Sequence, residues 1–92
     1  MKKIMTEQAI GYLSSHIGSA LNLLDSRYHP AKSFARSSDT IRRHAKEHDL
    51  FVEYKTRSGQ RRLLIPERNL EKLIKVLGLV IKVDDLYEAL TK

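Results

Sequence analysis

The segment Ser37–Pro66, SSDTIRRHAKEHDLFVEYKTRSGQRRLLIP, predicts a short capped helix followed by two short strands around a basic turn. Asp39 suits a helix N-cap position, with Ser37 and Ser38 just before it, because short polar side chains accept hydrogen bonds from the first backbone N–H groups of a helix. We therefore expect a helix that begins near Thr40.

The pattern of this helix separates an apolar side from a basic one. Successive helical residues turn by about 100°, so Ile41 and Ala45 face one way, whereas Arg43 and Lys46 face the other. The apolar face of this helix is therefore narrow, and its outer face is basic.

The residues after this helix predict a β-hairpin. Phe51, Val52 and Tyr54 favour a strand, and Ser58-Gly59 is a typical turn signal. The run Leu63–Pro66 then predicts a second strand that ends at the proline.

Length and composition indicate one small domain, residues 1–92, with room for a modest core. The chain has no cysteine, which excludes disulfides and zinc–thiolate sites. We recognise no signal peptide and no apolar run of about 18 residues. We therefore expect no membrane contact and a cytoplasmic, nucleoid-associated protein.

The positive charge of the chain is concentrated in its middle. Residues 27–62 contain ten Lys or Arg and four Asp or Glu, a balance of +6, whereas the remaining residues carry seven of each sign. Such a local excess attracts polyanions through the release of counterions.

The N-terminal part predicts an amphipathic helix over residues 6–25, with Thr6 as a cap and Pro30 stopping the helix before His29. Gly11, Gly18 and the run Ser14–His16 are weak helix formers, which leaves open an interruption of the helix near Ser14. Its apolar residues recur at spacings of three and four: Ile10, Leu13, Ile17, Leu21 and Leu24. Ala31–Arg36 is a candidate short helix. Together with the helix near Thr40 it has the spacing of a helix-turn-helix with a tight Ser-Ser-Asp turn.

The C-terminal part, residues 67–92, predicts further helices. Pro66 suits a first turn, Gly78 suits a helix end, and Asp84 could cap a final helix. The apolar stripes expected are Leu70, Leu73, Ile74 and Leu77 in the first helix and Leu86, Tyr87 and Leu90 in the last. The final helix either packs on its own domain or forms a dimer surface.

Two basic elements that flank one turn indicate a nucleic-acid interface. The alternative is that these charged side chains only form a solvent-exposed helix face and bind nothing, as is true of most charged faces. Arginine favours the first interpretation, because it binds phosphate and also reads guanine with two hydrogen bonds. The basic candidates for DNA binding are Arg42, Arg43, Lys46, Lys55, Arg57, Arg61 and Arg62.

His44, Glu47 and His48 match the pattern H-x-x-E-H, which occurs in a class of zinc proteases. The histidines flank the apolar side of the helix, no third ligand is signalled, and the chain is too small for a substrate cleft. We therefore expect no catalytic residues, no metal, no cofactor and no enzyme.

The chain also resembles the winged-helix DNA-binding proteins of the phage and transposon excisionase type, relatives of the MerR regulators. The likeness lies in Thr40-Ile41-Arg42-Arg43, the turn at Ser58-Gly59, the run Arg61–Pro66, and the helix opened by Asn69-Leu70. The resemblance implies that the helix from Thr40 to His48 enters the major groove while the hairpin, or wing, contacts the DNA backbone or the minor groove. It adds Thr40 to the candidate DNA-binding residues, beside Arg42, Arg43 and Lys46 on the helix and Arg57, Arg61 and Arg62 on the wing. The chain differs from that family in the residues that precede Ala31 and in Asn69, where an acidic residue is common.

The sequence therefore predicts a mostly α fold with a small β-hairpin, namely a winged helix-turn-helix with an additional N-terminal helix and a C-terminal helix. The expected function is sequence-specific binding of duplex DNA by a small regulator or recombination directionality factor, as a homodimer or cooperative oligomer. The alternative is a protein-binding inhibitor or adaptor that acts through its amphipathic helices, with the N-terminal helix as one binding surface. RNA binding ranks below both, because the strands lack an exposed aromatic set.

Overall fold

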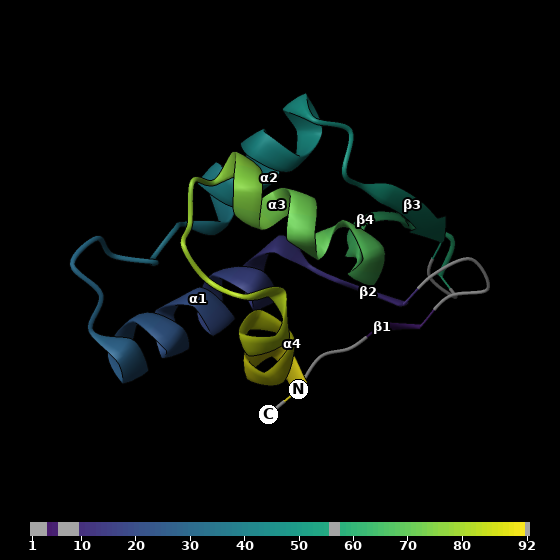
Figure 1. Ribbon diagram of the computed structural model, residues 1–92. Helices are drawn as coiled ribbons and strands as arrows, with labels where there is room; N and C mark the ends of the chain where they lie inside the picture. Colours follow the sequence, from purple (N-terminus) through teal and green to yellow (C-terminus); the bar gives the residue numbers. More distant parts are fainter. Residues whose placement is uncertain (1–3, 6–9, 56–57, 92) are drawn as a thin grey trace.

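The computed structural model describes residues 4–5, 10–55 and 58–91 of the chain (Figure 1). Within these residues the protein is a small α/β domain with four α-helices and an antiparallel sheet. The elements in chain order are β1 (Ile4–Met5), β2 (Ile10–Tyr12), α1 (Ser14–Tyr28), α2 (Ser38–Glu47), β3 (Val52–Lys55), β4 (Arg61–Pro66), the 3-10 helix η1 (Glu67–Asn69), α3 (Leu70–Val76) and α4 (Val83–Thr91).

Strand β4 lies between two antiparallel neighbours in the sheet, whose order is β1-β2-β4-β3. Residues 61–64 of β4 pair with β3, and residues 65–66 pair with β2. The predicted hairpin is confirmed, and Figure 1 shows it extending away from the helices. Gly59, with φ 83°, supplies the left-handed backbone of its turn, whereas Arg57 lies outside the described residues.

The expected helix over residues 6–25 is wrong over residues 10–12, whereas its expected cap Thr6 lies outside the described residues. Residues 10–12 form β2, and α1 begins only at Ser14. Pairing with β4 overrides the helical spacing, because the sheet supplies partners for the backbone groups of β2. Gly11 permits a close approach of the strands, since a Cβ there would lie 3.1 Å from the carbonyl oxygen of Ile65.

Residues 29–37 connect α1 to α2 without a helix. Helix α1 ends before His29, as expected, and His29 adopts a left-handed backbone with φ 47°. The helix expected over 31–36 is wrong, because the Phe34 N–H donates instead to Asp25 Oδ1 at 2.7 Å and the phenyl ring enters the core. The helix pair is therefore α1 and α2, joined by this connection rather than by a tight turn.

Helix α2 begins two residues earlier than expected. Its N-cap is Ser37 rather than Asp39, because the Ser37 Oγ accepts a hydrogen bond from the Thr40 N–H at 3.2 Å. Asp39 lies in the first turn instead, where its negative charge interacts favourably with the positive end of the helix dipole.

The end of α2 is fastened to the start of α3. Asp49 takes a left-handed backbone with φ 54°, and the Leu50 N–H donates to the Ala45 carbonyl oxygen at 2.8 Å. The Leu50 carbonyl in turn accepts a hydrogen bond from Asn69 Nδ2 at 2.9 Å. Asn69 thus fixes the direction in which the chain leaves α2 for the hairpin.

The C-terminal helices follow the expected apolar stripes. The stripe of α3 is buried, and Gly78, with φ 70°, comes directly after the C-cap residue Leu77. Helix α4 begins at Val83, so Asp84 lies in its first turn rather than at the cap. Leu86 and Leu90 are buried, which shows that this helix packs on its own domain.

One core joins all four α-helices to the sheet. Helix α1 contributes most to it, and its buried residues belong to the same cluster as those of α2, α3 and α4. The helix packs directly against α2 and α4. Tyr12 of β2 is fully buried, and burial raises the pKa of its hydroxyl to about 12, with smaller contributions from the charges of Glu67 and Tyr87. The largest fully buried side chains are Tyr12, Ile17, Leu21, Leu24, Ile41, Leu64, Ile65, Leu70, Leu73, Leu86, Leu90 and Pro66.

None of the helices formed by residues 10–55 and 58–91 is long and apolar enough to span a membrane.

Asn69→Ala is expected to lower the free energy of unfolding by about 1–2 kcal/mol, because the partly buried Leu50 carbonyl loses its hydrogen-bond donor. Asn22→Ala, at an exposed position of α1, is the matched control and should change the free energy by less than about 0.5 kcal/mol. Urea denaturation measures both values. Equal effects of the two substitutions would contradict this role of Asn69.

Candidate nucleic-acid interface

The start of α1, helix α2 and strand β4 meet around one groove with a volume of about 370 Å³. Three of its lining residues are arginines, two are serines and three are apolar. They are Leu13, Ser14, Ser15, Arg42, Phe51, Arg61, Arg62 and Leu63, and together they define what we call the arginine groove.

Helix α2 brings Arg42 to this groove. Ile41 and Ala45 are fully buried in the core, which fixes the rotation of the helix about its axis. Arg42 follows Ile41 and stays 60% exposed, with its Nη1 3.6 Å from Asp39 Oδ1. An exposed ion pair of this kind contributes little to stability, so the guanidinium can turn to another anion.

Strand β4 supplies the other two arginines. Arg61 stands opposite Lys55 in the hairpin, and its Nε lies 3.6 Å from Glu53 Oε1. Arg62 donates through Nη2 to Gln60 Oε1 at 3.0 Å. All these side chains are exposed, so the hairpin presents them to solvent beside α2.

The first turn of α1 forms another part of the groove wall. Its N-cap residue Leu13 has no side-chain acceptor, and the Leu13 carbonyl accepts from the N–H groups of His16 and Ile17. The first N–H groups of a helix have no intrahelical partner and carry partial positive charge. The backbone N–H groups of Ser14 and Ser15 therefore add neutral hydrogen-bond donors to a groove that already carries three arginines.

Gly18 lets α1 approach the start of α2 closely. A Cβ at this position would lie 3.3 Å from the Arg36 carbonyl oxygen and 3.8 Å from the Ser38 nitrogen. Because α1 approaches residues 36–38 so closely, Arg42 of α2 is held near the first turn of α1.

The structure brings together part of the predicted residue set. Arg42, Arg61 and Arg62 line the same groove, although they come from segments separated by the hairpin turn. Arg43 and Lys46 are exposed on α2 outside the lining of this groove.

The remaining predicted residues have other positions. Lys55 is exposed on β3, and the Thr40 hydroxyl lies 2.9 Å from Ser37 Oγ in the capping turn of α2. Arg57 falls outside the part of the chain that the structure describes. Ser14 and Ser15 are absent from the predicted site residues, because they fall in the middle of the expected N-terminal helix.

A second, larger groove of about 810 Å³ lies where residues 28–34 face α3 and the segment before α4. It is mainly apolar, with Phe34, Ile74 and Leu79 in its wall, and Val80 on its rim is 92% exposed. Its charged residues are of both signs. This apolar groove therefore differs in character from the arginine groove.

The end of α2 carries a possible metal-ligand set. The ligand atoms of His44, Glu47 and His48 lie within 4.8 Å of one another, the one such group of three found among the described residues. Glu47 of the same motif is thus a candidate for the third ligand that the sequence did not signal.

Comparisons with known protein families, with curated proteins and with solved structures found no match.

Glu53→Gln is expected to strengthen binding to heparin, because it removes the carboxylate beside Arg61. Glu71→Gln makes the same change of net charge at an exposed site of α3 outside the arginine groove. The salt concentration that elutes each variant from heparin should be higher for Glu53→Gln than for Glu71→Gln, while the free energy of unfolding changes by less than about 1 kcal/mol. Identical elution of the two variants would show that the arginine groove is not the anion-binding surface.

Proposed function

We propose that this protein binds duplex DNA through α2 and the β3–β4 hairpin, as a small regulator of transcription or an excisionase-like recombination factor. The observation that supports this proposal is the arginine groove, in which Arg42 of α2 meets Arg61 and Arg62 of β4 beside the first turn of α1. Arginines from two elements, α2 and β4, line one groove with α1. A single solvent-exposed helix face would not bring them together in this way.

The element order supports the same proposal. Strand β2 and the packed helices α1 and α2 are followed by the β3–β4 hairpin, whose second strand, β4, pairs with β2. This arrangement is broadly compatible with a helix-turn-helix followed by a wing, although the connection between its helices is longer than the sequence predicted.

The dimensions of α2 suit insertion into a major groove. Its ten residues make it about 15 Å long, and the major groove of B-DNA, at about 12 Å wide, admits one helix. In this mode Arg43 and Lys46 on the exposed face of α2 contact base edges. Arg42 and the arginines of β4 contact phosphates, which fix the position of the protein without selecting sequence.

Local acidic partners do not oppose this mode. Asp39 and Glu53 each hold one arginine of the groove through an exposed ion pair at 3.6 Å. A phosphate replaces such a carboxylate readily, because the pair contributes no more than about 1 kcal/mol in solvent. Assembly of several copies along DNA would raise the affinity of a module this small.

The alternative function, a protein-binding adaptor, has one observation in its favour. The apolar groove is lined by Val80, which is almost fully exposed, and by Tyr28, which is half-exposed. Under this alternative, Val80→Asp abolishes the interaction with a partner protein, whereas Arg61→Ala leaves it unchanged and no duplex binds at physiological salt.

The first test of DNA binding is its salt dependence. The chain is incubated with genomic fragments, the captured fragments are sequenced, and the selected duplex is titrated in a mobility-shift assay. With about six phosphate contacts, the affinity should fall by about 10³-fold or more between 50 and 200 mM salt. An affinity that is insensitive to salt would contradict phosphate binding by the arginine groove.

The second test separates base contacts from phosphate contacts. Arg43→Ala should reduce the preference for the selected duplex over a scrambled one, whereas Arg61→Ala should weaken binding to both alike. Lys72→Ala removes the same charge from the exposed side of α3 and is the control. If Lys72→Ala weakens binding as much as Arg61→Ala, only net charge matters and the proposed interface is wrong.

A further inference from the structure

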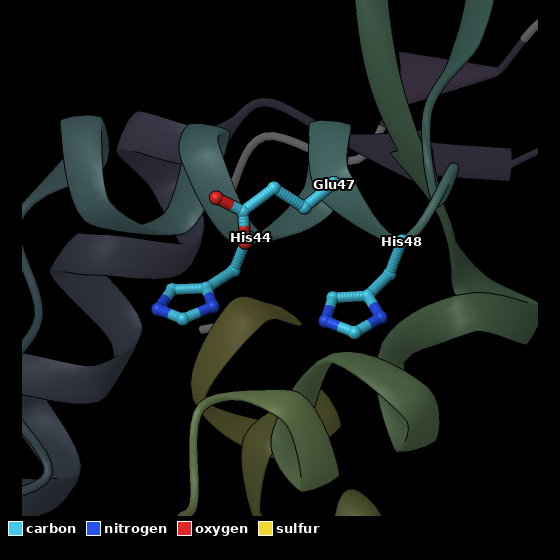
Figure 2. Close-up of side chains that lie close together, drawn as sticks. All are labelled: His44, Glu47 and His48. Carbon is cyan, nitrogen blue, oxygen red and sulfur yellow. The ribbon is translucent and has the colours of Figure 1, made fainter.

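Two histidines and a glutamate lie together at the end of α2 (Figure 2). Figure 2 shows both imidazole rings on the side of the helix that faces α3, with the Glu47 side chain turned back towards His44. The arrangement follows from helical spacing, because residues three and four positions apart lie on one face. Neither histidine takes part in the proposed DNA contacts.

We propose that His44, Glu47 and His48 bind one divalent transition-metal ion, with Zn²⁺ as the representative ion. Imidazole and carboxylate groups are ligands that such ions favour, and two histidines at positions i and i+4 of a helix form a known zinc-binding arrangement. One coordination position then remains for water.

The geometry needs only small movements of exposed side chains. Ligand atoms about 2.0–2.1 Å from a tetrahedral ion lie about 3.4 Å from one another, whereas these atoms already lie within 4.8 Å. Glu47 and His48 are exposed and His44 is half-buried, so rotation about their side-chain bonds closes the set without disturbing the core.

The position on the helix also favours a cation. His48 is the C-cap residue of α2, and His44 and Glu47 lie in its last turn, where the helix dipole is negative. An ion shared by His44 and His48 requires that turn to stay helical. Metal binding therefore fixes the end of α2 just before the left-handed Asp49 and the strand β3.

The test is a calorimetric titration of the full chain with ZnCl₂, after treatment with EDTA and removal of the chelator. We expect one Zn²⁺ per chain. His48→Ala should weaken the affinity by more than about tenfold, and Glu47→Gln should weaken it less, because an amide is a poorer ligand than a carboxylate. His29→Asn removes an imidazole elsewhere, at a residue with φ 47° that asparagine tolerates, and should leave the affinity unchanged.

Nuclear magnetic resonance of the histidine side chains identifies the ligands directly. On addition of Zn²⁺ the imidazole nitrogens of His44 and His48 should shift, and those of His16 and His29 should not. Because His48 and Glu47 are exposed, their variants should keep the far-ultraviolet circular dichroism of the wild type. The absence of saturable binding, an unchanged affinity of His48→Ala, or shifts at His16 or His29 instead would overturn the proposal.

Discussion

Strand β4 pairs with β3 along one part and with β2 along the other, and this shared pairing determines where the basic residues lie. The last residues of β4 hold β2, and β2 leads directly into α1. The first residues of β4 carry Arg61 and Arg62. A single strand thus places the hairpin arginines beside the first turn of α1, and the contact of α1 with α2 then adds Arg42.

Two glycines permit this packing for different reasons. Gly11 lies against the backbone of β4, where a side chain would meet the Ile65 carbonyl, and Gly18 lets α1 approach residues 36–38. A helical interpretation treats both glycines as weaknesses. In the structure they are instead the positions at which backbones come closest, which is a usual reason for glycine inside a regular element.

Much of the fold could be predicted from local signals. The hairpin, the end of α1 before His29, and the buried stripe of α3 all follow from short-range patterns and turn residues. Strand β2 could not be predicted, because it pairs with a strand more than fifty residues away and Ile10 also fits a helical spacing. The segment 31–36 was misjudged for a related reason, since the hydrogen bond from Phe34 to Asp25 is tertiary.

The candidate site also combines features that local sequence predicts with features that depend on tertiary pairing. The arginines were predicted from charge and from the order of helix and hairpin, and the structure brings three of them to one groove. The contribution of Ser14 and Ser15 depends on where α1 begins, which the pairing of β2 determines. The H-x-x-E-H pattern of α2 depends only on helical spacing, so it is visible in the sequence, whereas the closeness of Glu47 to both histidines is seen only in the positions of the side chains.

DNA binding through the arginine groove is tested most directly by mapping the DNA contact surface on the isotope-labelled chain. Amide and arginine side-chain resonances are followed while the selected duplex is added. The largest shifts are expected on Ser14 and Ser15, on the exposed face of α2, and on Arg61 and Arg62. Shifts confined to Tyr28, Val80 and α4, or no shifts with any duplex, would contradict it.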